Sequence, residues 1–157
     1  MKKQLTINYE WLNHWCELPE SEHVLIGKAR EAVKEAYAPY SHFKVGAAVL
    51  LEDGTIIKGN NQENIAYPSG LCAERVALFY ANANYPGLVV KTILVLAEGA
   101  LIAPDECVSP CGSCRQVIVE SEARQEEDIR AILVSQDGKT WIFNSIKDIL
   151  VFPFGVK

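Results

Sequence analysis

The chain has no excess of positive charge and no long apolar run. Its 157 residues include 15 lysines and arginines against 20 aspartates and glutamates, a net charge of −5 at pH 7. This balance argues against a basic track for polymeric nucleic acid but is compatible with a small or uncharged substrate. The longest apolar stretch, residues 88 to 97, contains Lys91 and is too short to span a bilayer. We therefore expect no binding of polymeric nucleic acid and no membrane-spanning segment.

We also expect neither a secretory leader nor a disulfide framework. Residues 4 to 10 are too polar for the apolar part of a signal peptide. The number of cysteines, five, is odd, and three of them lie in two short clusters. Such clustering favours metal ligation in a reducing compartment over disulfide bonds. These features predict a cytoplasmic protein.

The remaining composition is that of a globular domain, with 49% hydrophobic and 22% charged residues. The length suits one compact domain and is too short for two ordinary ones, and we find no repeat or linker. Residues 1–20 carry two tryptophans and stop near Pro19. We expect them to be an N-terminal extension packed on a domain that spans residues 21–157.

Helical and extended patterns alternate along that domain. Helices are expected at residues 21–38, 72–84, from 111 or 114 to about 122, and 145–150. Strands are expected at residues 43–51, 55–57, 91–97, 129–135 and 140–143, with a hairpin turn at Asp53-Gly54. This order predicts the α/β class, with a mixed central β-sheet covered by α-helices.

The two cysteine clusters, Cys72-Ala73-Glu74 and Pro110-Cys111-Gly112-Ser113-Cys114, each begin a helical pattern. A helix N-terminus stabilises negative charge and lowers the pKa of a thiol, and zinc requires the thiolate. A structural zinc site uses four protein ligands, whereas a catalytic site usually leaves one position for water. Three thiolates beside a carboxylate therefore predict metal-assisted hydrolysis.

Other interpretations of the cysteines exist. A lone C-x-x-C pair also suits a redox dithiol or half of a structural zinc knuckle. A redox role would leave Cys72 and Glu74 unexplained, and a closed zinc site would need Cys107 as its fourth ligand. We instead expect Cys16 and Cys107 to be buried and inert. The three histidines lie away from both clusters and are expected to be ordinary packing or surface residues: His14, His23 and His42.

Several spaced motifs resemble those of the compact, three-cysteine cytidine deaminases. They are Phe43-Lys44-Val45-Gly46-Ala47-Ala48, Asn61-Gln62-Glu63-Asn64, Cys72-Ala73-Glu74-Arg75 and Pro110-Cys111-Gly112-Ser113-Cys114-Arg115-Gln116. They occur in the family's order and cover residues 22 to 135. The resemblance implies a cytidine-deaminase-like fold and hydrolysis of cytidine and deoxycytidine to uridine and deoxyuridine plus ammonia, a step of pyrimidine salvage.

The resemblance also implies a role for each matched residue. Cys72, Cys111 and Cys114 match the ligands of one zinc ion per chain, and Glu74 matches the proton shuttle while zinc-bound hydroxide attacks C4 of the pyrimidine. The substrate-binding residues it implies are an aromatic flanking the base and a pair holding the ribose hydroxyls: Phe43, Asn61 and Glu63. An aromatic face suits a base, and an amide with a carboxylate suits sugar hydroxyls.

Three thiolates outweigh the charge of one zinc ion, which should make a bound water less acidic. Arg75 and Arg115 are the nearby cations. Our hypothesis is that Arg75 hydrogen-bonds a ligand thiolate and withdraws charge from it. The alternative for each arginine is a surface salt bridge, and it weighs more for Arg115.

The resemblance implies a homotetramer in which neighbouring subunits complete each active site. Tyr67 and the C-terminal aromatics Phe152 and Phe154 are candidates for contacts to a neighbour. Residues 150–155 depart from the family's usual Leu-Leu-Pro ending, so the sequence does not choose between the two phenylalanines. The purpose of the N-terminal extension is also open.

Two rival functions remain. One is another zinc deaminase, acting on a free base, a nucleotide or an aminonucleoside antibiotic. The other is a non-catalytic zinc module. Asn61 and Glu63 favour a neutral ribose, and no phosphate-binding cluster is evident, but nothing in the sequence separates cytidine from deoxycytidine.

Overall fold

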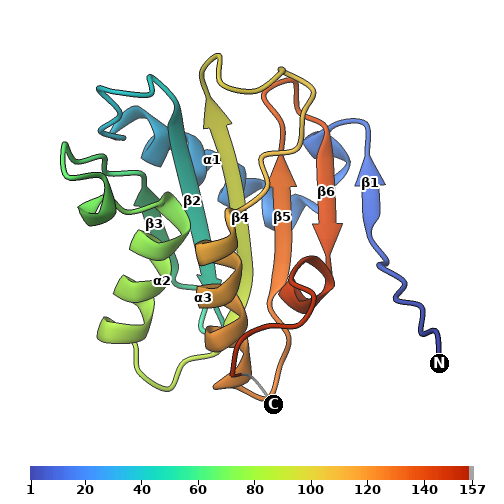
Figure 1. Cartoon of the computed structure of the whole chain (residues 1–157). Helices are drawn as coiled ribbons and strands as arrows, with labels where there is room; N and C mark the ends of the chain where they lie inside the picture. The colour runs from blue at the N-terminus through green and yellow to red at the C-terminus, as the bar shows by residue number, and fades with distance from the viewer. Residues whose placement is uncertain (156–157) are drawn as a thin grey trace.

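The computed structural model describes residues 1–155 and shows one mixed β-sheet between two helical layers (Figure 1). Helix α1 (Glu20–Lys34) covers one face. Helices α2 (Ala73–Asn84) and α3 (Gly112–Ala123) cover the other. The predicted α/β class, with a mixed sheet covered by helices, is confirmed. Within residues 1–155, no helix has both the length and the apolar character needed to cross a membrane.

The six strands follow the order β1-β6-β5-β4-β2-β3 across the sheet. Their bounds are β1 Glu10–Leu12, β2 Lys44–Leu51, β3 Ile56–Asn60, β4 Val90–Glu98, β5 Arg130–Val134 and β6 Thr140–Phe143. Residues 1–155 also form three short 3₁₀ helices: η1 Trp15–Glu17, η2 Tyr67–Ser69 and η3 Ile146–Ile149. Strands β4 and β5 are parallel and every other neighbouring pair is antiparallel, so the sheet is mixed.

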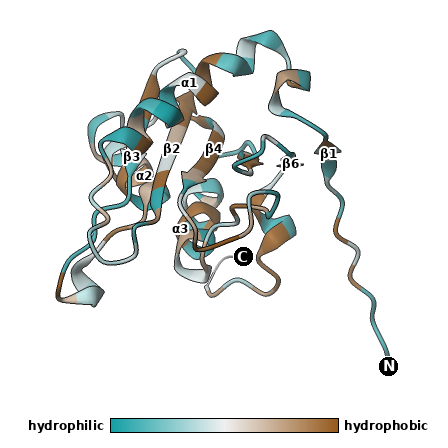
Figure 2. Ribbon diagram, turned by 90° about the horizontal axis from the view of Figure 1, so that it is seen from above, coloured by the Kyte–Doolittle hydropathy of each residue, from teal (hydrophilic) through white to brown (hydrophobic). Residues whose placement is uncertain are grey.

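Two hydrophobic cores lie on the two faces of the sheet, because successive side chains of a strand point to opposite sides. In β4, Val95 and Ala97 pack into the core beneath α2 and α3. Leu94 and Leu96 pack into the core beneath α1. Figure 2 shows α1 on one side of the strands and the other two helices opposite. Strand β4 is therefore buried on both faces, which explains its nearly continuous apolar sequence.

The helix predicted over residues 21–38 ends early, at Lys34. The chain leaves the helix because Tyr37 pairs with the segment that follows β3. The Tyr37 amide donates to the carbonyl oxygen of Asn61 at 3.1 Å, and the Tyr37 carbonyl accepts from the amide of Glu63 at 2.9 Å. These tertiary hydrogen bonds override the local helical pattern.

The other predicted elements agree with the structure to within one or two residues, with two exceptions. The strand expected at residues 55–57 extends to Asn60 in β3. The short helix expected at residues 145–150 is the 3₁₀ helix η3, whose N-cap is Ser145. The serine side chain accepts from the amide of Lys147, which fixes the start of η3.

Residues 10–18 contact the sheet and α1. Strand β1 pairs with β6 at one edge of the sheet. Leu18 is buried in the core beneath α1, and the Arg30 guanidinium lies 5.0 Å from the centre of the Trp15 ring. The division of the chain at residue 20 stays a prediction.

Candidate active site

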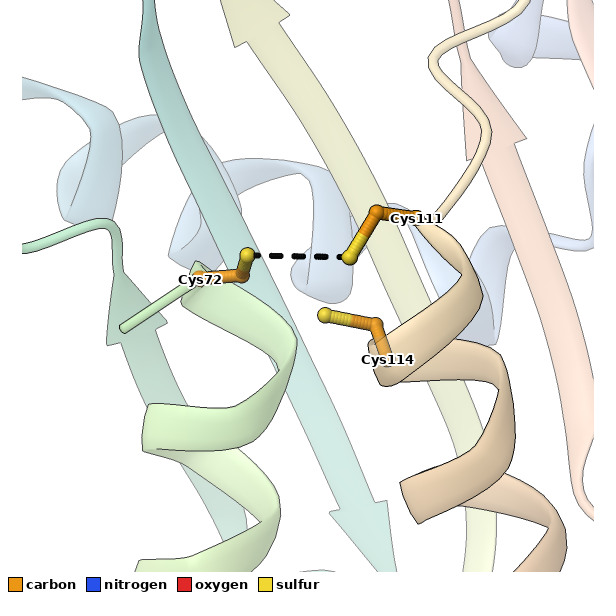
Figure 3. Close-up of side chains that lie close together, drawn as sticks. All are labelled: Cys72, Cys111 and Cys114. Carbon is orange, nitrogen blue, oxygen red and sulfur yellow. Dashed lines mark hydrogen bonds between the residues drawn. The ribbon is translucent and has the colours of Figure 1, made fainter. Parts of the chain in front are cut away.

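The N-termini of α2 and α3 bring three thiols together (Figure 3). Cys72 is the N-cap of α2, Cys111 is the N-cap of α3, and Cys114 lies in the first turn of α3. Their Sγ atoms lie within 4.8 Å of one another, and the Cys72 and Cys111 sulfurs are 3.9 Å apart. The structure thus places the three predicted metal ligands in one cluster.

The geometry of this cluster fits zinc. Thiolates at about 2.3 Å from a tetrahedral zinc ion lie about 3.8 Å from one another. The thiol cluster is close to that spacing, and it is the one compact group of His, Cys, Asp and Glu ligands within residues 1–155. It contains three thiols and no fourth ligand, so a tetrahedral ion held here keeps one position for another ligand.

The two other cysteines lie outside the cluster, and both are less buried than expected. Cys16 is exposed, not buried. Cys107 is half-buried, and burial raises its pKa to about 11. A thiol with that pKa stays protonated near neutral pH and is a poor metal ligand.

A glycine sets where α2 begins on the sheet. A Cβ atom added to Gly59 in β3 would lie 2.3 Å from the carbonyl oxygen of Ala73 and 2.6 Å from the amide of Ala77. Only a residue without a side chain allows this approach. The first turn of α2 therefore rests directly on β3, which fixes the position of Cys72.

Glu74 lies in the first turn of α2 beside the thiols, with 4% of its surface exposed. Burial is the main cause that raises its pKa, and the negative charge of Cys72 adds to the effect. A carboxyl group with a raised pKa is suited to taking up and returning protons near neutral pH.

Arg75 contacts the thiol cluster directly. Its Nη2 atom donates to Cys72 Sγ at 3.5 Å. Hydrogen bonding with Cys114, and then with Arg75, lowers the pKa of Cys72 to about 5. The same neighbourhood raises the pKa of Cys114, which shares a hydrogen bond with Cys72 and is buried. The cluster therefore favours a thiolate at Cys72.

A cavity of about 650 Å³ opens beside the cluster. Its lining includes the predicted substrate-binding residues, two of the thiols, the buried glutamate and the arginine that follows it: Phe43, Asn61, Glu63, Cys72, Cys111, Glu74 and Arg75. Tyr40, Ser41 and Tyr67 also line this cavity. Cys114 is buried, outside the lining. Residues from four separate motifs thus meet in one space.

Asn61 uses half of its side-chain amide to hold the start of β2. Its Oδ1 accepts from the amide of Val45 at 2.8 Å, and its Nδ2 donates to the carbonyl oxygen of Phe43 at 2.9 Å. An amide has two N–H donors and two acceptor positions, so one of each remains. Asn61 can therefore position β2 and still bind a ligand.

Glu63 is held by residues that the sequence analysis did not identify. Its carboxylate accepts from the amides of Tyr40 and Ser41 and from the Ser41 hydroxyl. The sequence signal for this turn is a serine two residues before Phe43, because a serine hydroxyl can accept from the amide two residues on.

Arg115 donates to oxygen atoms, whereas Arg75 donates to a thiol. Arg115 donates to the carbonyl oxygens of Pro110 and Ile149, both at 2.8 Å, and to Ser109 Oγ at 2.7 Å. Within residues 1–155 it forms no ion pair. Its contacts tie the loop before Cys111 to the C-terminal segment.

Comparison with known proteins agrees with this geometry. Residues 19–126 match the family model of the cytidine and deoxycytidylate deaminase zinc-binding region. A cytidine deaminase of Sporosarcina psychrophila is 50% identical over 97 residues, 61% of this chain and 66% of that protein. One of Halalkalibacterium halodurans is 46% identical over 97 residues, 62% of this chain and 69% of that protein. These matches thus span about two thirds of each relative.

A solved structure covers more of the chain. The 1.6 Å crystal structure of cytidine deaminase from Burkholderia pseudomallei has a TM-score of 0.72 at 40% identity, covering 84% of this chain and 98% of that chain. The fold and the site define the class, a zinc-dependent deaminase hydrolase. The chain belongs to the cytidine and deoxycytidylate deaminase family. The predictions of family, layered fold and zinc cofactor are confirmed.

Proposed function

We propose that the chain catalyses the hydrolytic deamination of cytidine and deoxycytidine, with release of ammonia. The observation that carries this proposal is the buried Glu74 beside three converging thiols, in a cavity that also contains Phe43, Asn61 and Glu63. The names of the similar proteins support the same activity.

In this proposal Cys72, Cys111 and Cys114 hold one zinc ion. When bound, zinc lowers the pKa of water and supplies a nucleophile at neutral pH. Glu74 accepts a proton from the attacking water and delivers it to N3 of the pyrimidine while C4 is attacked. Glu74 then carries the second proton of that water to the amino group, which leaves as ammonia. The raised pKa of Glu74 suits both proton transfers.

The substrate-binding roles are part of the same proposal. Phe43 flanks the pyrimidine ring, and Asn61 and Glu63 hold the ribose hydroxyls. Asn61 has one donor and one acceptor left for this task, because its contacts with Val45 and Phe43 use only one of each. Arg75 reduces the negative charge on Cys72 through its hydrogen bond.

We propose further that residues 21–157 are the deaminase domain and that the protein works as a cytoplasmic homotetramer with shared active sites. Five free cysteines suit a reducing compartment. Exposed aromatic residues support contacts between subunits: Tyr67, Phe152 and Phe154. Phe154 is the better placed of the two phenylalanines, because both its amide and its carbonyl are held by the side chain of Gln116, each at 3.0 Å.

An ultraviolet assay with cytidine, deoxycytidine, cytosine and cytidine monophosphate tests the substrate class, alongside a zinc count per chain. Turnover of the two nucleosides alone, with one zinc per chain, is the expected result. Turnover of the monophosphate or the free base would favour another deaminase. Zinc-loaded protein that releases no ammonia from any of the four would indicate a non-catalytic zinc module.

A further inference from the structure

The turn before β2 contains the hydroxyl of Ser41, which forms hydrogen bonds with two of the segments that line the cavity. Ser41 Oγ donates to Glu63 Oε1 and accepts from the amide of Phe43 at 3.1 Å. Glu63 follows β3, whereas Phe43 precedes β2, and the two antiparallel strands bring these segments to the same end of the sheet (Figure 1). One side chain therefore links the residue proposed for the base with a residue proposed for the ribose.

The carboxylate of Glu63 is nearly fully engaged by this turn. Its Oε2 atom accepts from the amides of Tyr40 at 2.8 Å and Ser41 at 3.3 Å. A carboxylate has about four acceptor positions, and the Ser41 hydroxyl takes a third, on Oε1. The position that remains is on Oε1 and is available to a ligand hydroxyl. The Ser41 hydrogen bond sets the direction of this free position on Oε1, because the backbone amides contact only Oε2.

The turn itself is held in place by the backbone. His42 has a φ of 54°, in the left-handed region, and its amide donates to the carbonyl oxygen of Ala38 at 3.1 Å. A Cβ atom added to Gly99 would lie 2.7 Å from the His42 carbonyl oxygen and 3.0 Å from the Cα atom of Phe43. The residue that follows β4 thus packs against the turn, so the backbone beside Ser41 is held in position.

We propose that Ser41 is a positioning residue, whose hydroxyl orients the Glu63 carboxylate for a hydroxyl of the substrate's sugar and fixes Glu63 relative to Phe43. This proposal rests on the proposed function. It assigns to Ser41 a share of the selectivity for a nucleoside with ring hydroxyls, although Ser41 need not touch the substrate.

Replacing Ser41 with alanine leaves Glu63 Oε1 free to rotate away. We expect Ser41→Ala to raise KM for cytidine about 10-fold, the size of a hydrogen bond to a charged group, with kcat within about 2-fold. For 2′,3′-dideoxycytidine, which lacks both ring hydroxyls, kcat/KM changes less than about 2-fold, because neither of the hydroxyls assigned to Glu63 is present. Equal losses on the two substrates, or an unchanged KM for cytidine, would overturn the proposal.

Three variants separate positioning from folding. Ser41→Thr keeps the hydroxyl and restores KM. Adding Ser41→Ala to Glu63→Ala raises KM no further, because the oriented group is already gone. The matched control is Thr55→Ala, which removes a hydroxyl that donates to the carboxylate of Asp53 at 3.0 Å in the β2–β3 turn. This turn lies at the other end of β2, and its loss leaves KM unchanged.

The pH dependence gives a readout that a purely structural role does not move. The hydrogen bond from Ser41 is the main cause that lowers the pKa of Glu63. Without it the carboxylate becomes protonated at a higher pH, and a protonated Glu63 accepts fewer hydrogen bonds. In Ser41→Ala, KM for cytidine therefore begins its acid rise at a higher pH, whereas KM for 2′,3′-dideoxycytidine keeps its profile. The groups that face Glu63 are the Tyr40 and Ser41 amides, the Ser41 hydroxyl and His42.

A binding measurement distinguishes failure of this proposal from failure of the proposed function. Calorimetry with uridine and 2′,3′-dideoxyuridine requires no turnover. Ser41→Ala should weaken binding of uridine about 10-fold and of 2′,3′-dideoxyuridine less than about 2-fold. If the wild-type protein deaminates neither cytidine nor deoxycytidine, the proposed function fails. The affinities for uridine and 2′,3′-dideoxyuridine still decide the role of Ser41. Equal weakening of both ligands, or of neither, would reject that role.

Discussion

The first turns of α2 and α3 contain the same residue types and use them differently. Each helix begins at a cysteine and carries an arginine within the next four residues. Arg75 of α2 donates to the sulfur of Cys72, whereas Arg115 of α3 donates to two backbone carbonyls and a serine hydroxyl. Identical charge in similar motifs therefore supports two tasks: one arginine acts on a metal ligand, and the other holds a loop.

The two helices also differ in what accompanies their cysteines. The α2 turn contains the buried Glu74 and rests on Gly59 of β3. The α3 turn contains two thiols and no carboxylate, and its neighbour Gln116 binds the backbone of Phe154. Proton transfer is thus expected to depend on α2, attachment of the C-terminal segment on α3, and retention of the metal on both helices.

The largest expected effect tests what the two turns have in common. Cys72→Ala on α2 and Cys114→Ala on α3 should each abolish zinc binding and turnover together, because two thiolates are too few to hold the ion. Cys107→Ala is the control and should keep one zinc per chain, since Cys107 lies outside the cluster. Metal analysis of the purified variants with the nucleoside assay checks this. Full zinc content in Cys72→Ala would contradict the ligand assignment.

The next effect separates the two helices. Glu74→Gln should keep zinc but lower kcat about 10²- to 10⁴-fold, the usual contribution of a general acid–base group. The matched control is Glu122→Gln on α3, a glutamate of which only 2% is exposed. The Glu122 carboxylate accepts from the amide of Ile129 and the hydroxyl of Ser145, so its loss should lower thermal stability and leave kcat within about 2-fold. A fully active Glu74→Gln enzyme would disprove the proton-shuttle role.

A smaller effect concerns the arginine that contacts a thiol. Arg75→Gln removes a positive charge from Cys72, so the thiolates neutralise more of the zinc charge and the attacking water becomes less acidic. The acid limb of the kcat profile should move to higher pH, with a loss of about 10-fold at neutral pH. Arg115→Gln should leave the acid limb of the kcat profile at the same pH. An unshifted profile in Arg75→Gln with intact zinc would reject the hypothesis.

Sequence reasoning located the thiol cluster because its determinants are local. A cysteine at a helix start needs only the helical pattern after it. Helix α2 begins within one residue of the prediction, and α3 begins within one residue of position 111, the first of its two predicted starts. The position of Phe43, Asn61 and Glu63 in the same cavity followed from the order of the motifs in a family, not from any property of those residues alone.

The features that sequence reasoning missed depend on contacts between distant residues. Helix α1 ends at Lys34 because Tyr37 pairs with a segment more than 20 residues away. The carboxylate of Glu63 is held by the turn before β2, and the partner of Arg115 at Ile149 lies 34 positions along the chain. No periodicity in the sequence encodes such partners, and a charge in a motif does not reveal whether it faces a thiol or a carbonyl.

The smallest effect tests whether Arg115 only holds the loop. Arg115→Gln loses up to three hydrogen bonds, which should destabilise the fold by about 1 to 3 kcal/mol because the part-buried carbonyls lose their donors. We expect a lower denaturant midpoint and faster release of zinc to a chelator, since the loop that carries Cys111 is less constrained. The pH profile of kcat should stay unchanged, which is the opposite of the result expected for Arg75→Gln. A shifted profile in Arg115→Gln, with normal zinc release, would show that both arginines act on the charge of the site and that their different contacts do not separate their roles.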